Sequence, residues 1–161
     1  MNVSIEHLFP VIKKSLDEGK CVRFISTGGS MMPFIYNDDE VKMMPFNKYI
    51  RKGDIVLLKA SDKFILHRVV RLDLNKFYIR GDAQNASEGP YSYENVIGVV
   101  SESVHKGRTR NHREGFWRFA SAAWRAGFPI SLFYFNFYKS LRRLLGKILR
   151  GLKILPPANR K

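Results

Sequence analysis

The feature that most constrains the fold is a series of short apolar segments between residues 21 and 104, each bounded by turn-forming residues. Six such segments can be recognised: CVRFIS, VKMMPF, DIVLLKA, FILHRVV, KFYIR and VIGVVSESV. The pieces between them are rich in Gly, Asn, Asp and Ser, as in TGGS, YNDD, RKGD and GDAQNASEGP. Short strands at regular spacing, separated by such turns, are typical of antiparallel β structure. We therefore expect a mainly β domain, a barrel or a sandwich, over residues 21–104.

A helix is expected before these segments, over residues 1–20. Apolar residues recur there at helical spacing, namely Ile5, Leu8, Phe9, Ile12 and Leu16. Pro10 lies among them, so we expect the helix to start near this residue or to bend there. Gly19 is a suitable C-terminal stop for the helix.

Charge is divided unevenly along the chain. Residues 1–104 contain 14 Lys and Arg against 13 Asp and Glu, whereas residues 105–161 contain 14 Lys and Arg against Glu114 alone. The polar, basic segment 105–115 is expected to be a linker. Residues 116–161 are expected to form a helical tail in which Leu and Ile share one face and Lys and Arg lie mainly opposite.

A basic, aromatic tail of this kind can bind polyanions. Its apolar face favours an anionic membrane surface over nucleic acid as the partner of residues 116–161. The alternative is a solvated basic helix that packs on the β domain through its apolar stripe.

The apolar part of this tail is short for a membrane-spanning helix. Its longest uncharged run, Ala126–Tyr138, has 13 residues, whereas a span needs about 20. Residues 119–138 reach that length but include Arg125 and Pro129, so an interfacial segment is favoured over a span. Residues 1–20 lack the uninterrupted apolar core of a secretory signal. We expect the protein to be cytoplasmic or peripheral at a membrane.

Metal and cofactor signals are lacking in the sequence. No pair or cluster of residues has the spacing of metal ligands, and no glycine-rich loop has the pattern that binds phosphate. Cys21 is the single cysteine, so an intrachain disulfide is impossible. We expect neither a metal nor another cofactor.

The stretch TGGSMMPF holds one hydroxyl in a restricted backbone setting. Gly28 and Gly29 permit φ values that are closed to other residues, and they leave room for a substrate to approach. Pro33 restricts the exit from the turn. Ser30 therefore fits a positioned nucleophile, although a plain glycine turn with a capping serine explains the stretch equally well.

A serine nucleophile needs a base, and His67 is the best candidate. It lies in the apolar segment FILHRVV, and an imidazole can accept a proton near neutral pH. The alternative is a satisfied core histidine. Asp82 and Glu88, both in RGDAQNASEG, are the candidates to orient the imidazole. Asp82 could instead make only a turn after Gly81.

Five motifs occur in a defined order between residues 22 and 104: GSMMP, KGDIVLL, ILHRVV, RGDAQN and VIGVV. In this order they resemble the motifs of type I signal peptidases and of the wider clan that includes the self-cleaving LexA-type repressors. The resemblance implies a half-barrel β sandwich and a serine endopeptidase that uses no cofactor.

The resemblance also implies roles for individual residues. The nucleophile of the family's Gly-Ser-Met-x-Pro motif corresponds to Ser30. A histidine followed by Arg-Val is the base in the endoplasmic-reticulum, archaeal and spore-former enzymes, and it corresponds to His67. The acidic loop of the family corresponds to Asp82, and Glu88 stands where these relatives usually have Asp. Many signal peptidases carry an oxyanion-binding hydroxyl two residues before the nucleophile, and here that position is Gly28.

The expected function is a signal-peptidase-like serine endopeptidase that cleaves a precursor or leader peptide by Ser–His acyl transfer. Its substrate is expected to bind as an added strand. Two alternatives stay open. One is a LexA-like regulator that cleaves itself, with Ala126–Gly127 as the candidate bond. The other is a catalytically silent binding module whose basic tail binds lipid or nucleic acid.

Overall fold

A computed structural model gives the structure of the chain and describes residues 5–61 and 63–127, together with Phe137 and Leu141. The chain divides into two compact units, Met1–Ala126 and Gly127–Lys161. The first unit contains the sheet and the two α-helices whose bounds are given below. In the second unit, Phe137 and Leu141 are helical and exposed to solvent.

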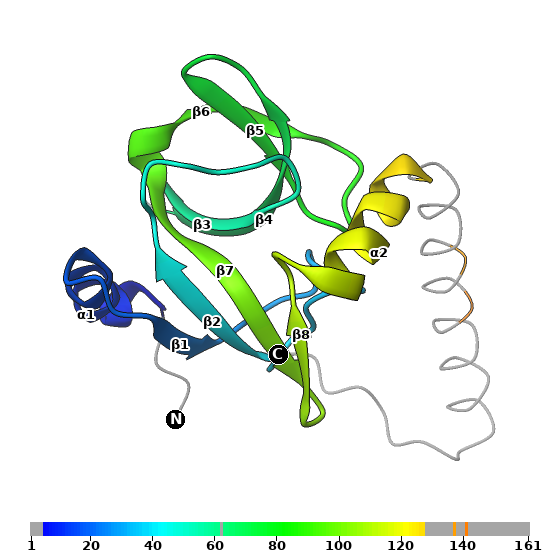
Figure 1. The fold of residues 1–161 in the computed structure, drawn as a ribbon, viewed down its shortest axis with the longest axis horizontal. Coiled ribbons are helices and arrows are strands. Elements are labelled where there is room, and N and C mark those ends of the chain that lie inside the picture. Colours follow the sequence, from blue (N-terminus) through cyan, green and yellow to red (C-terminus); the bar gives the residue numbers. More distant parts are fainter. Residues whose placement is uncertain (1–4, 62, 128–136, 138–140, 142–161) are drawn as a thin grey trace, which may run out of the picture. The chain divides into compact units, whose positions relative to one another are not determined.

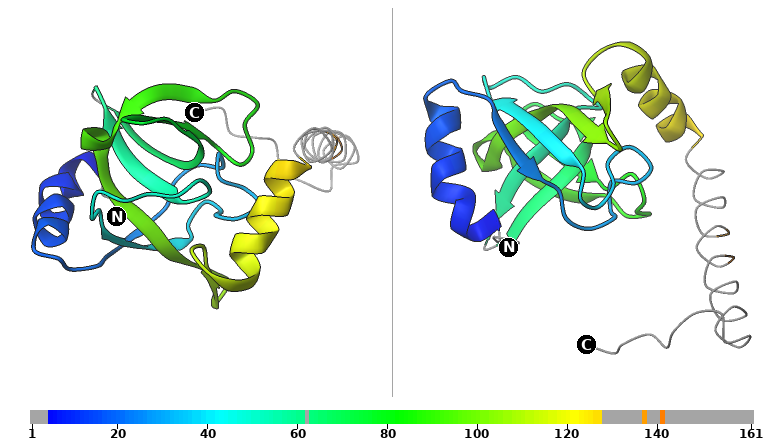
Figure 2. Two further views of the ribbon diagram at one scale, coloured as in Figure 1. Left: turned by 45° about the horizontal axis from the view of Figure 1, so that its top comes forward. Right: turned by 90° about the horizontal axis from the view of Figure 1, so that it is seen from below.

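The first unit is mainly β and consists of an antiparallel eight-stranded sheet with two α-helices (Figure 1). The strands are β1 (Val22–Ile25), β2 (Glu40–Pro45), β3 (Ile55–Ala60), β4 (Lys63–Leu72), β5 (Lys76–Arg80), β6 (Glu88–Ser92), β7 (Val96–His105) and β8 (Arg108–Asn111). The helices are α1 (Ile5–Asp17), a single 3-10 turn η1 (Tyr93–Asn95) and α2 (Gly115–Ala126). The views in Figure 2 place α1 and α2 on opposite sides of the strands.

The strand order is β1-β2-β7-β3-β4-β5-β6, and β8 pairs with β7. β7 pairs with three strands. β2 pairs along one of its edges, and on the other edge β3 pairs with its first half and β8 with its second half. β4 is shared in a similar way, since Lys63–Arg68 pairs with β3 whereas pairing with β5 begins at Arg68. The first half of β4 therefore has one edge without a strand partner in the described chain.

All six strands expected from the sequence are present, and β6 and β8 are additional. β6 contains Gly89 and Pro90, and within a sheet proline is normally confined to edge strands. β8 consists of polar residues, RTRN, and adds to the outer half of β7. Residues 105–115, expected to be a linker, instead contain the end of β7 and the whole of β8.

α1 begins at Ile5 rather than near Pro10, which lies inside the helix. Packing explains why the helix persists, because Ile12 and Leu16 are buried against Met43 and Leu57 of the sheet. Gly19 ends the helix as expected: its φ is 78° and its N–H donates to the Leu16 carbonyl oxygen at 2.9 Å.

The expected helical tail, residues 116–161, starts as α2 in the first unit. Residues 128–136, 138–140 and 142–161 of this prediction lie outside the described residues. Within the described part of the chain, no helix combines the length and the apolarity needed to cross a membrane.

Candidate active site

Ser30 lies in the loop that joins β1 to β2, and the two ends of this loop are tied together. The Ser26 N–H donates to the Asp39 carbonyl oxygen at 2.9 Å, and the Ser26 hydroxyl donates to the carbonyl oxygens of Tyr36 and Asp39. The Asp39 carboxylate accepts the Tyr36 N–H at 2.8 Å and lies 2.6 Å from His105 Nδ1 on β7. These contacts fix the loop to the sheet on both sides of Ser30.

Apolar side chains inside the same loop hold it against the core. Met31 and Ile35 are 3% and 2% exposed and pack with Val41, Ile55 and Val100. The methionine next to Ser30 is therefore a core residue, and the serine itself stays partly exposed. This arrangement anchors the backbone of Ser30, while the residue itself stays accessible from the groove that it lines.

The acidic loop after β5 is bonded directly to the backbone of Ser30. The Ala83 N–H donates to the Ser30 carbonyl oxygen at 2.9 Å. A Cβ atom at Gly81 would stand 2.7 Å from the same carbonyl oxygen, which is closer than atoms can approach. Glycine in the RGDAQN motif is thus required by the contact between this loop and the Ser30 loop.

His67 lies on β4 opposite Val56 of β3 and is 5% exposed. Its Nδ1 atom is 3.5 Å from Glu88 Oε1 and donates or accepts no hydrogen bond among the described residues. Burial lowers the pKa of His67 below 6.5, and this effect exceeds the opposite influence of the Glu88 and Asp82 carboxylates. The imidazole is consequently neutral near pH 7, which is the form that can accept a proton.

Asp82 contacts Arg68 and not the imidazole. Its carboxylate receives the Arg68 Nε and Nη2 groups at 2.8 and 2.7 Å, while Arg68 Nη1 donates to the Gly53 carbonyl oxygen. The side chains of Arg68 and Asp82 are 0% and 3% exposed, so this ion pair is fully buried. Of the two acidic candidates, the structure brings Glu88 to His67 and Asp82 to Arg68.

Ser30, His67 and Glu88 line one groove with a volume of about 930 Å³. Its walls include the consecutive residues 22–28, from β1 and the turn after it, and the consecutive residues 63–67 of β4. β1 is the terminal strand of the sheet, and the first half of β4 also has an unpaired edge in the described chain. The groove therefore lies between two strand edges that can still form backbone hydrogen bonds.

Gly28, where many signal peptidases have a hydroxyl, has a backbone conformation that favours glycine. Its φ is 87°, although no atom would obstruct a side chain there. Its N–H donates to Asn37 Oδ1 at 2.9 Å. The absence of a hydroxyl at this position thus follows from the shape of the turn.

Two other groups at the groove can stabilise negative charge. The Ser30 N–H makes no hydrogen bond within the described residues. Gln84 lines the groove, and because its Oε1 atom accepts the Gly81 N–H at 3.2 Å, its amide NH2 remains without a partner in the described chain. Sequence reasoning did not single out Gln84, although the RGDAQN motif contains this residue and was the available signal.

No protein-family model matches the chain, and searches of curated proteins and of solved structures found no match. Among the described residues, no group of three or more His, Cys, Asp and Glu side chains could hold a metal ion. The evidence for the site therefore consists of its own residues and their geometry.

Proposed function

We propose that this protein is a signal-peptidase-like serine endopeptidase that cleaves a precursor or leader peptide, with Ser30 as nucleophile and His67 as base. The observation that carries the proposal is the single groove that Ser30, His67 and Glu88 line together, between two unpaired strand edges. The five motifs that resemble those of type I signal peptidases add independent support.

The substrate would bind in an extended conformation between β1 and the first half of β4. Both edges offer backbone N–H and C=O groups, so a peptide can add to the sheet as a further strand. Apolar residues form much of the groove, including Phe24, Leu57 and Leu66. They favour a substrate with uncharged side chains on the face directed into the groove.

In the proposed reaction, His67 accepts the proton of the Ser30 hydroxyl while Oγ attacks the substrate carbonyl carbon. The tetrahedral intermediate collapses as the imidazolium returns this proton to the leaving amine, which breaks the peptide bond. Water then attacks the acyl carbon while His67 accepts a proton from it. The imidazolium returns this proton to Ser30 Oγ as the ester bond breaks, which releases the peptide acid and restores the serine. The Ser30 N–H and the Gln84 amide are the proposed donors to the oxyanion.

Glu88 is the proposed positioning residue for His67. Its carboxylate lies 3.5 Å from Nδ1 and raises the pKa of the imidazole, so it stabilises the imidazolium that forms during attack. Asp82 has a different proposed role. Through its ion pair with Arg68 it holds the loop whose Ala83 N–H binds the Ser30 carbonyl oxygen.

The same proposal includes two further points. The sheet has a half-barrel form, and the protein lies at the surface of an anionic membrane through residues 116–161. Support for membrane contact comes from α2, where Phe116 and Phe119 are 70% and 73% exposed. Large aromatic side chains that are exposed on one face of a helix are typical of segments that lie in a membrane surface.

The proposal is tested by incubating the purified chain with a library of unfolded peptides and identifying cleavage products by mass spectrometry. Wild type is expected to produce products that Ser30→Ala and His67→Ala do not. Ser87→Ala, which removes an exposed hydroxyl from the loop of Glu88, serves as the control and should cleave like wild type. If Ser30→Ala cleaves as well as wild type, the proposed nucleophile is wrong.

A further inference from the structure

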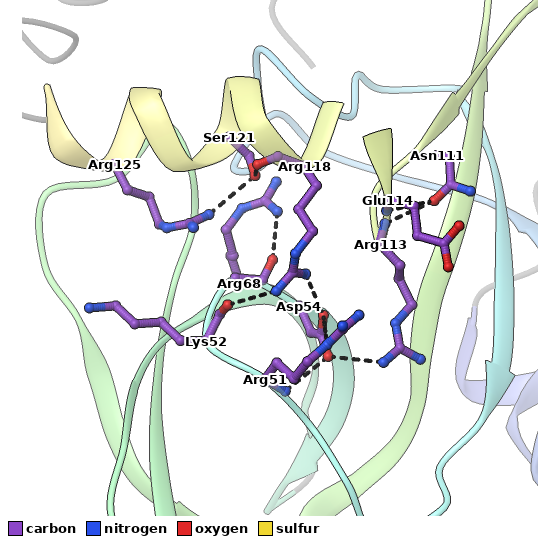
Figure 3. Close-up of polar contacts among 11 residues, drawn as sticks. Arg51, Lys52, Asp54, Arg68, Asn111, Arg113, Glu114, Arg118, Ser121 and Arg125 are labelled. Carbon is purple, nitrogen blue, oxygen red and sulfur yellow. Dashed lines mark hydrogen bonds and ion pairs between the residues drawn. The ribbon is translucent and has the colours of Figure 1, made fainter. Parts of the chain in front are cut away.

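α2 directs its two arginines and Trp124 toward the sheet, and it directs Phe116 and Phe119 toward solvent. Ser121 is 1% exposed and Arg118 and Arg125 are half-buried, whereas Phe116 and Phe119 are mostly exposed. Figure 3 shows Arg118 and Arg125 extending from the helix toward the turn before β3. A surface helix normally directs its cations toward solvent, so the two inward arginines need a partner.

Asp54 supplies only part of the negative charge that these arginines require. It is 1% exposed and accepts the Arg51 N–H at 2.9 Å. Its two carboxylate oxygens also face Arg118 Nη1 at 3.1 Å and Arg113 Nη2 at 3.4 Å. Arg51 Nε also lies 3.9 Å from Asp54 Oδ1, so one carboxylate faces three guanidinium groups, and a single negative charge cannot balance them.

Arg125 has no carboxylate partner in the described chain. Its Nη1 donates to the Ser121 hydroxyl at 3.2 Å. Its Nη2 stands 2.9 Å from the place that a Cβ atom of Gly53 would occupy, so the guanidinium lies against the turn that contains Lys52. Arg118 reaches the same turn, because its Nη2 donates to the Lys52 carbonyl oxygen at 3.4 Å.

The electrostatic setting of Arg125 agrees with this geometry. Burial, and then the charges of Arg68, Arg118 and Arg80, lower the pKa of Arg125 to about 10 against the opposite effect of Asp82. The guanidinium stays charged near pH 7, and it does so in a region of surplus positive potential.

The Asp82 carboxylate, which also acts on Arg125, is already paired with Arg68, and the sequence from α2 onward adds no further carboxylate side chain. Residues 115–161 contain neither Asp nor Glu. An anion from outside the chain is then the natural partner. A planar guanidinium binds two oxygens of a phosphate group at once, and the exposed Lys52 side chain, on the turn that Arg118 and Arg125 contact, can add a further charge contact.

We propose that Arg118, Arg125 and Lys52 form a binding site for a phosphate-bearing anion at the junction of α2 with the turn before β3. The phosphate group could belong to a free phosphorylated molecule or to a phospholipid headgroup. None of the three residues lines the groove of Ser30 and His67, so the site is distinct from the proposed catalytic one.

Isothermal titration of the full-length chain with pyrophosphate, and flotation with vesicles of phosphatidylcholine with or without phosphatidylglycerol, test the proposal. Arg125→Gln and Lys52→Gln are each expected to weaken binding by about tenfold, since each removes charge-assisted contacts. Arg108→Gln removes the same charge from an exposed position on β8 and should bind like wild type.

Pyrophosphate binding that the two variants weaken supports a site for a free phosphate compound. Binding to phosphatidylglycerol vesicles alone, weakened by the same variants, supports a lipid headgroup. The proposal is overturned if wild type binds neither, or if Arg108→Gln loses as much affinity as Arg125→Gln. Lys52 is exposed, so its variant provides the test should Arg125→Gln fail to fold.

Discussion

Replacing Asp82 with alanine is expected to destabilise the first unit far more than the loss of an ordinary surface charge. The substitution removes three contacts between the Asp82 carboxylate and the Arg68 guanidinium, at 2.7 to 3.1 Å. Arg68, which is 0% exposed, would keep the Gly53 carbonyl oxygen as its described hydrogen-bond partner. A buried cation would then be left without its counter-charge.

Breaking a buried ion pair from one side typically costs about 3–5 kcal/mol, because one charge stays desolvated. We expect this loss in the free energy of unfolding of Asp82→Ala. For a chain of this size it corresponds to a fall of roughly 6–20 °C in Tm. The exposed pair Arg71–Asp73 provides the matched control: its contact distance is similar, 2.9 Å, but its side chains are 59% and 48% exposed. Asp73→Ala should cost less than about 1 kcal/mol.

Urea unfolding followed by tryptophan fluorescence measures both variants. Trp124 is a suitable probe, since its Nε1 donates to the Asp82 carbonyl oxygen at 3.1 Å. A double variant, Arg68→Met with Asp82→Leu, removes both charges and should recover much of the stability lost in Asp82→Ala. The reasoning is refuted if Asp82→Ala and Asp73→Ala are equally stable, or if the double variant is the least stable of all.

Further predictions concern the site and the core. Peptide cleavage should fall as the pH drops through the pKa of His67, which lies below 6.5, because only the neutral imidazole accepts a proton. Glu88→Gln should move this loss of cleavage to lower pH, since Glu88 raises the pKa of His67. Gly81→Ala should reduce kcat, because its Cβ would displace the Ser30 carbonyl oxygen, and a normal kcat would contradict the docking of the two loops. Ser103→Ala should cost about 1–3 kcal/mol in urea unfolding, because the buried His112 Nε2 loses its hydrogen bond to Ser103 Oγ at 2.8 Å. Burial holds the pKa of His112 at about 3, below its ordinary 6.5. As pH falls, His112 is therefore protonated at a lower pH in the folded state than in the unfolded state. Stability should therefore decline between pH 6.5 and about 3, and His112→Gln should make the decline shallower.

Strand positions could be predicted from the sequence because alternation and turn residues are local signals. The segments KFYIR and DIVLLKA, for example, correspond closely to β5 and β3. β6 and β8 could not be predicted in this way. β6 contains Gly89 and Pro90, and β8 is wholly polar, so both strands depend on the partner that they join at an edge.

The members of the candidate site could be proposed from their residue types, but their pairing could not. Asp82 and Glu88 are six residues apart in one loop, and either carboxylate could have faced His67. The deciding partner is Arg68, next to His67 on β4, whose side chain reaches the buried Asp82. A contact of this kind depends on how β4 and the loop meet in three dimensions.

The orientation of α2 was similarly beyond sequence reasoning. The hydrophobic pattern alone would direct Phe116 and Phe119 toward the core. They are exposed because the sheet offers polar partners on this side: the Asp54 carboxylate for Arg118 and the Asp82 carbonyl oxygen for Trp124.

The central claim, that His67 activates Ser30 for acyl transfer, is tested most directly by covalent labelling. The folded chain would be treated with two serine-reactive probes, a fluorophosphonate, which phosphonylates serine, and a β-lactam, which acylates it, and the modified residue would be located by peptide mass spectrometry. We predict modification of Ser30 in wild type and in Ser87→Ala, and its loss in His67→Ala. Wild type without label at Ser30, or equal labelling of Ser30 in His67→Ala, would contradict the account.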